Sequence, residues 1–159
     1  MSQKDGEVND PILQWVTYQL EDETYGINVM QVQEVLRITE IAPVPAAPSD
    51  VLGIINLRGN VVTVIDTRSR FGLQPKASND DQSRIIIVEV NGNVIGMLVD
   101  SVAEVVYLHQ SEIDSVPVVN NDDSSRFIQG VCSREDQLLI LVDVNKFLTE
   151  EEVSDFTGV

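Results

Sequence analysis

Short runs of β-branched and aliphatic residues, separated by polar turns, dominate the chain. Runs of this kind are typical of β-strands. A polar turn such as Asn91-Gly92-Asn93 bounds each of them. The clearest runs lie at residues 15–20, 61–65, 85–90 and 138–142. Closely spaced strands and turns predict hairpins and an all-β fold.

Two of these runs are apolar at successive positions instead of alternating, namely Ile85–Val88 and Leu138–Val142. A strand that is apolar on both faces is covered on both faces. A single open sheet with one solvated face does not supply that cover, whereas two packed β units do. The pattern therefore favours two units with these strands between them.

The chain contains an internal duplication. The segment Gly26-Ile27-x-Val29-x-x-Val32-x-Glu34-Val35 matches Gly96-Met97-x-Val99-x-x-Val102-x-Glu104-Val105. The interval from Gly53 to Asp66 has the same length as the interval from Gly130 to Asp143, and both β runs end in Asp. We expect about five short strands in each copy. Five strands of this size favour a small barrel, since closure removes exposed sheet edges.

The predicted architecture is therefore all-β, with two similar small five-stranded β-barrels packed together and a few short helices. We place the barrels at residues 12–75 and 84–148. A polar linker at 76–83 joins them. Residues 1–11 are predicted to form a disordered tail, and residues 149–159 a C-terminal helix and tail. Asp66 and Asp143 are expected to cap short helices that follow the last strand of each barrel.

Charge and length restrict the classes of function. The 159 residues carry a net charge of −16, with 26 acidic and 10 basic residues. Such a field repels phosphate, so nucleic acid and anionic membrane surfaces are poor partners. No apolar run approaches the ~20 residues of a membrane span. The polar, acidic N-terminus is unlike a signal peptide.

Candidate catalytic residues are few. His109 is the only histidine and Cys132 the only cysteine, so they are too few for a closed zinc site, and we expect no metal and no cofactor. Cys132 aligns with the apolar Ile55 of the first copy, which favours a buried small side chain over a nucleophile. His109 as a general base, or Asp66 and Asp143 as acid–base groups, leaves a small enzyme as the alternative interpretation.

One stretch resembles a known family. Asn56-Leu57-Arg58-Gly59, followed by a β run that ends in Asp66, is similar to the CheW family of bacterial chemotaxis coupling proteins. Tyr25-Gly26-Ile27, Val32-Gln33-Glu34-Val35 and Gly96-Met97-Leu98-Val99-Asp100 fit the same family in order and spacing. The resemblance runs from about Leu13 to Phe156. We expect no kinase, phosphotransfer or receiver domain beside it.

The resemblance implies a non-catalytic adaptor with two β-barrels. Its partners would be the cytoplasmic tips of methyl-accepting chemoreceptors and the regulatory domain of the histidine kinase CheA. The protein would be cytoplasmic, recruited to the inner face of the membrane through receptor arrays, and a monomer in dilute solution. A coupling protein of another chemosensory pathway, such as a pilus-linked one, is the alternative within this family.

The resemblance also implies docking residues. A receptor groove would comprise Val29, Val32, Glu34, Gly53, Asn56, Leu57 and Arg58, with Glu34 and Arg58 as a charge pair. Gly53 would permit close approach of the partner, or would simply end a helix. The kinase would contact Val118 and Val119. The arginines at positions 58, 68 and 70 form either a basic interface or a set of solvated loop charges.

Overall fold

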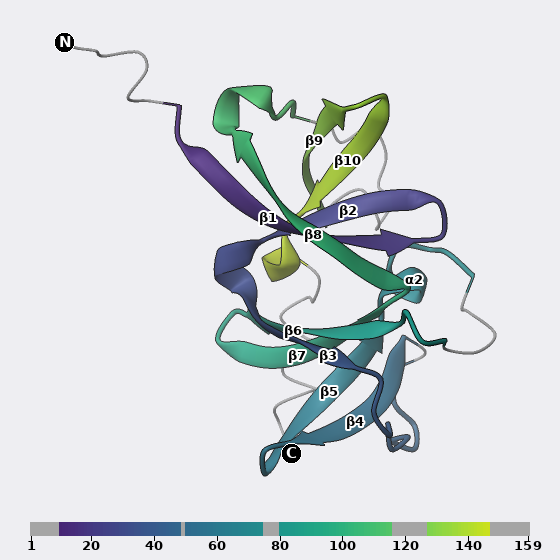
Figure 1. Cartoon of the computed structure of the whole chain (residues 1–159). Helices are drawn as coiled ribbons and strands as arrows, with labels where there is room; N and C mark the ends of the chain where they lie inside the picture. The colour runs from purple at the N-terminus through teal and green to yellow at the C-terminus, as the bar shows by residue number, and fades with distance from the viewer. Residues whose placement is uncertain (1–9, 49, 75–79, 116–126, 147–159) are drawn as a thin grey trace.

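The computed structural model describes residues 10–48, 50–74, 80–115 and 127–146, and in these residues ten strands form two five-stranded sheets (Figure 1). Sheet A has the strand order β8-β1-β2-β10-β9, and sheet B has the order β3-β6-β7-β5-β4. The prediction of an all-β fold with two five-stranded units is confirmed.

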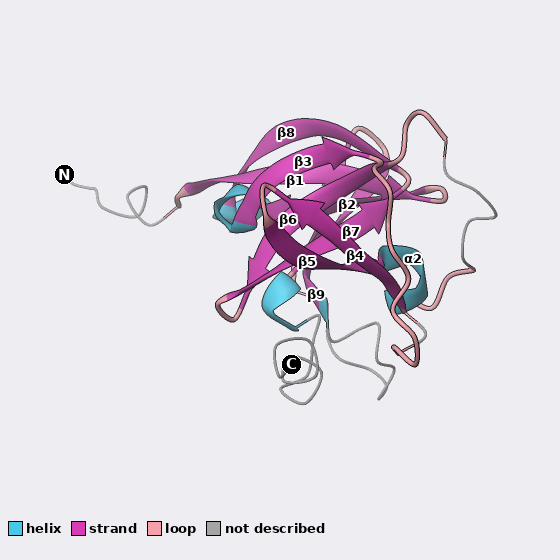
Figure 2. Cartoon of the chain, turned by 90° about the horizontal axis from the view of Figure 1, so that it is seen from below, coloured by secondary structure: helices cyan, strands magenta, loops and turns pink. Residues whose placement is uncertain are grey.

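The strand bounds follow the predicted runs closely. The strands are β1 (Ile12–Leu20), β2 (Glu23–Asn28), β3 (Val32–Arg37), β4 (Val51–Leu57), β5 (Asn60–Asp66), β6 (Arg84–Val90), β7 (Asn93–Val99), β8 (Ser101–His109), β9 (Ile128–Arg134) and β10 (Gln137–Val142). The helical turns are η1 (Val29–Gln31), α2 (Thr67–Arg70), η2 (Gln110–Glu112) and η4 (Val144–Lys146). Figure 2 shows that these short helices lie at the periphery of the strands.

The two sheets do not correspond to the two continuous segments. Sheet A takes β1 and β2 from the first copy and β8, β9 and β10 from the second. Sheet B takes β3, β4 and β5 from the first copy and β6 and β7 from the second. The division into barrels at residues 12–75 and 84–148 is therefore wrong in its connectivity. A sequence repeat marks equivalent positions, but an exchanged strand makes the same contacts as one that stays with its own copy.

Parallel pairing joins the two copies inside each sheet. In sheet A, β2 lies parallel to β10, with Gly26 opposite Leu141. In sheet B, β7 lies parallel to β5, with Gly96 opposite Val64. The two pairings occupy equivalent positions of the duplication, so the repeat found in the sequence is a structural twofold repeat.

The sheets are open, and single bridges draw their ends together. The backbone of Ala42, after β3, exchanges two 2.8 Å hydrogen bonds with Ile54 on β4. In the equivalent place, the backbone of Asp114 exchanges two 2.8 Å hydrogen bonds with Val131 on β9. Each unit is thus a curled sheet with one closing bridge, and the prediction of fully closed barrels is corrected to that extent.

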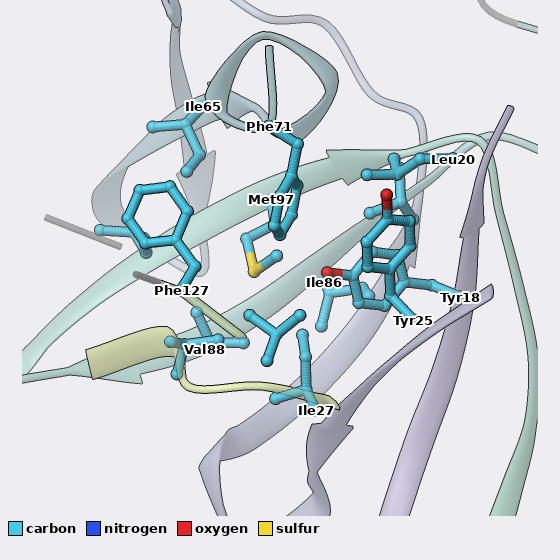
Figure 3. Packing of buried hydrophobic residues seen from close by; sticks show 14 of the residues in the cluster. Tyr18, Leu20, Tyr25, Ile27, Ile65, Phe71, Ile86, Val88, Met97 and Phe127 are labelled. Atoms are coloured by element: carbon cyan, nitrogen blue, oxygen red, sulfur yellow. The ribbon is translucent and has the colours of Figure 1, made fainter. Parts of the chain in front are cut away.

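A central apolar cluster lies between the sheets, and each sheet encloses a smaller cluster of its own. Figure 3 shows Tyr18, Tyr25 and Ile27 of sheet A facing Ile86, Val88 and Met97 of sheet B. The rings of Tyr18 and Tyr25 stack with centroids 5.5 Å apart, and Tyr25 continues onto Phe71 at 4.9 Å.

Strand β6 accounts for the first continuous apolar run. Ile86 and Val88 face the central cluster, and Ile85 and Ile87 face the cluster inside sheet B. All four side chains are fully buried, as the pattern predicts. Strand β10 differs, because Leu138 at its start is 46% exposed, so only the later part of this strand is covered on both faces.

The predicted end segments lie only partly within the described residues. Asp10 belongs to the predicted tail, yet its carboxylate accepts hydrogen bonds from the backbone N–H and the hydroxyl of Ser111, both at 2.9 Å. Asp10 therefore belongs to the folded part of the chain. In the predicted linker only residues 80–83 are described, and they form a turn in which the Ser83 N–H donates to the Asp80 carbonyl at 3.1 Å. The C-terminal helix at 149–159 lies outside the described residues.

We expect Gly53→Ala to destabilise the fold strongly, because a Cβ at this position would lie 2.2 Å from the carbonyl oxygen of Ala42. The closing bridge of sheet B would have to shift, at a cost of about 3 kcal/mol in the free energy of unfolding. Urea unfolding followed by the fluorescence of the buried Trp15 measures this change.

Gly72→Ala is the matched control. Gly72 also has a positive φ of 78°, but open space surrounds its Cβ position. It should lose only about 1 kcal/mol, from the left-handed backbone alone. Equal losses in the two variants would show that the Ala42 contact is not the reason for glycine at position 53.

Candidate functional site

The two ends of sheet B meet at an ion pair. Glu34 lies on β3 and Arg58 lies in the hairpin between β4 and β5, and β3 and β4 are the terminal strands of this sheet. The guanidinium donates to both carboxylate oxygens of Glu34, from Nη1 to Oε1 at 3.3 Å and from Nη2 to Oε2. The pair predicted from the family resemblance is therefore present, and it spans the mouth of the curled sheet.

The alternation of β3 directs Glu34 toward the mouth. Val32, Glu34 and Leu36 are half-buried, while the residues between them are exposed. Val32 packs against the central cluster and Leu36 against the cluster inside sheet B. Glu34 is the charged member of an otherwise apolar row, so its carboxylate lies where the apolar interior opens to solvent.

Each residue of the Asn56-Leu57-Arg58-Gly59 motif has a distinct part in the hairpin. The Asn56 side chain accepts a hydrogen bond from the Gly59 N–H at 2.9 Å. Arg58 and Gly59 both have positive φ, 52° and 88°, as a tight two-residue hairpin requires. Leu57 packs against the cluster inside sheet B. The motif thus fixes the backbone from which Arg58 reaches Glu34.

Hydrogen bonding from Arg58 and its positive charge lower the pKa of Glu34, and the same contact raises the pKa of Arg58. The Arg58 side chain is 69% exposed. Exposed pairs contribute little to stability because water and salt screen them. The contribution of this pair is therefore geometric, since bidentate contact fixes both side chains at the mouth.

Gly53 is buried and does not lie on the surface of the site. The space that its missing side chain leaves is filled by the carbonyl of Ala42. Gly130, the equivalent glycine of the second copy, meets Ile113 and Asp114 in the same manner. Gly53 therefore acts indirectly on the site, because it leaves room for the Ala42–Ile54 bridge that holds β4 in place.

Apolar side chains are also exposed on the elements next to the ion pair in sequence, η1 before β3 and β5 after the Arg58 hairpin. Val29 is half-buried in η1, which Asn28 caps by accepting from the Met30 N–H at 2.9 Å. Met30 is 87% exposed and Val61, after the Arg58 hairpin, is 69% exposed. Neither residue was predicted from the sequence. Val61 could have been found, because Val62 and Val64 alternate into the core and leave Val61 outward.

The three arginines do not form one basic interface. Arg68 is largely buried, donates to both carboxylate oxygens of Asp100, and lies 3.6 Å from Glu21. These contacts join α2, the β7–β8 junction and the β1–β2 hairpin, and so fasten sheet B to sheet A. The interpretation of a basic interface rested on the closeness of the three arginines in sequence, and it does not hold for the buried Arg68.

Arg70 is also structural. It donates to Asp50 at 2.6 Å, and its guanidinium lies 5.7 Å from the centroid of the Phe127 ring. Only 11% of its side chain is exposed. Neither Arg68 nor Arg70 matches the alternative of a solvated loop charge, and Arg58 alone of the three projects from the surface.

The side chains of the enzyme hypothesis have structural contacts. The Asp66 carboxylate accepts from the Arg68 N–H at 3.1 Å, and the Asp143 carboxylate accepts from the Asn145 N–H at 3.0 Å, so both caps are confirmed. His109 lies at the end of β8, with Nδ1 3.6 Å from an Asp10 oxygen. Burial raises the pKa of the Cys132 thiol, as expected for a small core side chain.

The described ranges contain no group of three or more residues suited to hold a metal ion. Nor does this part of the chain contain a helix with the length and apolar character needed to cross a bilayer. The predicted kinase contacts, Val118 and Val119, lie outside the described residues.

Comparisons with known proteins agree with this architecture. A family described as CheW-like domain matches residues 14–152. The chain is 32% identical over 155 residues to the chemotaxis protein CheW of Treponema pallidum, across 96% of this chain and 91% of that protein. It is 33% identical over 138 residues to the chemotaxis protein CheW of Rhizobium meliloti, across 86% and 88% of the two chains.

A solved structure shares the fold. The scaffolding protein TtCheW from Thermoanaerobacter tengcongensis superposes with a TM-score of 0.81 at 33% identity, covering 89% of this chain and 97% of that chain. The match extends over both sheets rather than one motif. The chain belongs to the CheW family of chemotaxis proteins, which are adaptors and scaffolds and not enzymes.

Proposed function

We propose that this chain couples transmembrane chemoreceptors to the histidine kinase CheA, in the cytoplasm at the inner face of the membrane. The observation that carries the proposal is the exposed Glu34–Arg58 pair at the mouth of sheet B. A solvated pair adds little stability, so an exposed guanidinium held in place at this mouth is better explained by contact with a partner.

The receptor side of the proposal uses the mouth of sheet B. The cytoplasmic tip of a receptor is a helical hairpin, and amphipathic helices dock by placing apolar side chains against an apolar surface. Val29 and Val32 supply part of that surface, and the Asn56-Leu57-Arg58 hairpin supplies its charged rim. Met30 and Val61, both exposed, are further apolar side chains on the adjoining elements that a receptor helix could cover.

The kinase side rests on the twofold repeat. A partner built from the same kind of sheet pair can contact this chain head to tail, and such contacts close into rings. Val118 and Val119 remain candidates for that contact. Individually weak interfaces of this kind gain avidity when many are linked in an array, which is consistent with a monomer in dilute solution.

Reversal of either charge of the pair should reduce receptor-dependent activation of CheA by tenfold or more. Arg58→Glu and Glu34→Arg each place like charges opposite one another and open the mouth. The double variant restores a pair of opposite polarity and should recover much of the activation. The assay combines receptor-containing membranes, CheA and this chain, and measures kinase phosphorylation.

Arg37→Glu is the matched control, because Arg37 lies on the same strand but is exposed on the opposite row. It makes the same change in net charge as Arg58→Glu and should leave activation intact. Full activation by both single variants would remove the mouth of sheet B as the receptor site. Activation only with components of a pilus-linked pathway would retain the coupling role but change the partners.

Val32→Asp should weaken binding of a receptor tip fragment by about tenfold, because a carboxylate would replace apolar contact area in the docking surface. Val35→Asp provides the comparison, since Val35 lies on the exposed row of the same strand. Titration calorimetry measures the binding, and circular dichroism verifies that both variants stay folded. Equal affinity in the two variants would contradict the assignment of Val32 to the docking surface.

A further inference from the structure

The twofold repeat gives the Glu34–Arg58 site an equivalent place in sheet A. Glu104 matches Glu34, as the aligned Glu34-Val35 and Glu104-Val105 segments show. Glu135 matches Arg58, because each lies five residues after its glycine, Gly53 or Gly130, in the aligned intervals. Glu135 also has the same left-handed backbone, with φ of 49° against 52° for Arg58. The second copy therefore has two acids where the first has an ion pair.

Sheet A has a hollow of about 160 Å³ at this place. Its lining residues come from β8, from the β9–β10 hairpin, and from β1 and β2. In sheet B the side chain of Arg58 spans the equivalent gap, from the β4–β5 hairpin to Glu34 on β3. Two glutamates cannot form such a bridge, so the mouth of sheet A remains open.

The charge and apolar character of the hollow indicate what fits it. Glu104 and Glu135 line it with one basic residue, Arg134, and the adjoining hollow adds Asp22 and Glu23. Leu138 lies in both hollows and is 46% exposed, at the position equivalent to Val61. Thr17 and Thr24 complete the floor. The site thus offers an acidic rim around an exposed aliphatic side chain.

The hollow between Glu104 and Glu135 has the size of one side chain, since pockets for small molecules are typically about 300–1,000 Å³. The adjoining hollow, at about 360 Å³, leaves room for a neighbouring residue of the same partner. A guanidinium matches two carboxylates better than an ammonium does, because its planar fork donates in two directions. A second copy of this chain is a poor occupant, since two molecules of net charge −16 repel each other.

We propose that the hollow of sheet A is a second docking surface, which accepts an arginine and an adjacent apolar residue from a partner protein. The partner's arginine would take the place that Arg58 holds in sheet B, between Glu104 and Glu135. The apolar neighbour would cover Leu138. This surface is separate from the proposed receptor site, and its test uses neither receptor nor kinase.

The test is an NMR titration of the ¹⁵N-labelled full chain with the peptide acetyl-Arg-Leu-amide. Saturable shifts should appear at Thr17, Thr24 and Leu138. Acetyl-citrulline-Leu-amide, which keeps the shape of arginine without its charge, should bind at least tenfold more weakly. Equal shifts with both peptides, or shifts spread over the acidic surface, would overturn the proposal.

Glu135→Arg is the decisive variant, because an arginine there can pair with Glu104 and close the hollow as Arg58 closes sheet B. It should keep its fold and lose the peptide shifts. Glu89→Arg, an exposed site on β6 with the same charge change, should retain them. Leu138→Ala should bind the peptide severalfold more weakly, which provides a second measurement should Glu135→Arg fail to fold.

Two further outcomes would count against the proposal. Retained binding by Glu135→Arg would show that the acids are not the recognition elements. Shifts at the hollow that grow with protein concentration alone, without peptide, would identify a second copy of the chain as the occupant.

Discussion

Parallel pairing between the two copies of the repeat is the constraint on which the rest of the structure depends. Sheet A is continuous only because β10 lies beside β2, and sheet B only because β5 lies beside β7. Without the second copy, sheet A would keep two of its five strands. The central apolar cluster draws on both sheets. Neither copy can bury its apolar strands alone, so the chain is one folding unit rather than two linked domains.

The elements and caps of this fold were predictable from sequence, but the strand exchange was not. Alternation, turn residues and the helix-capping carboxylates Asp66 and Asp143 are local signals, and the structure confirms them. Exchange leaves every local contact unchanged, so no local signal reports it. The role of Gly53 could not be predicted either, because it depends on contact with Ala42, and the sequence pattern does not indicate where the loop containing Ala42 lies. The Glu34–Arg58 pair was expected only through the family resemblance.

The copies diverge where the two sheets are fastened and where their mouths open. Arg68 fastens the sheets through Asp100 and Glu21, whereas in the second copy Asn145 accepts from the Asn91 N–H at 3.4 Å. The mouth of sheet B is closed by an ion pair, and the mouth of sheet A is lined by glutamates. The cores remain equivalent while the surfaces differ, so one repeat provides a single scaffold with two chemically different faces.

The distribution of basic residues explains how a strongly acidic protein can retain selective contacts. Arg68 and Arg70 neutralise carboxylates of this chain in places where they are mostly buried, so they contribute little positive charge to the surface. Arg58 is different, because it is exposed and its position is fixed by Glu34 and by the Asn56 hairpin. A partner that approaches this acidic surface meets an oriented guanidinium next to apolar side chains. Orientation of a few groups, rather than the strength of any one contact, can therefore distinguish a correct partner from the many basic proteins that the net charge alone would attract.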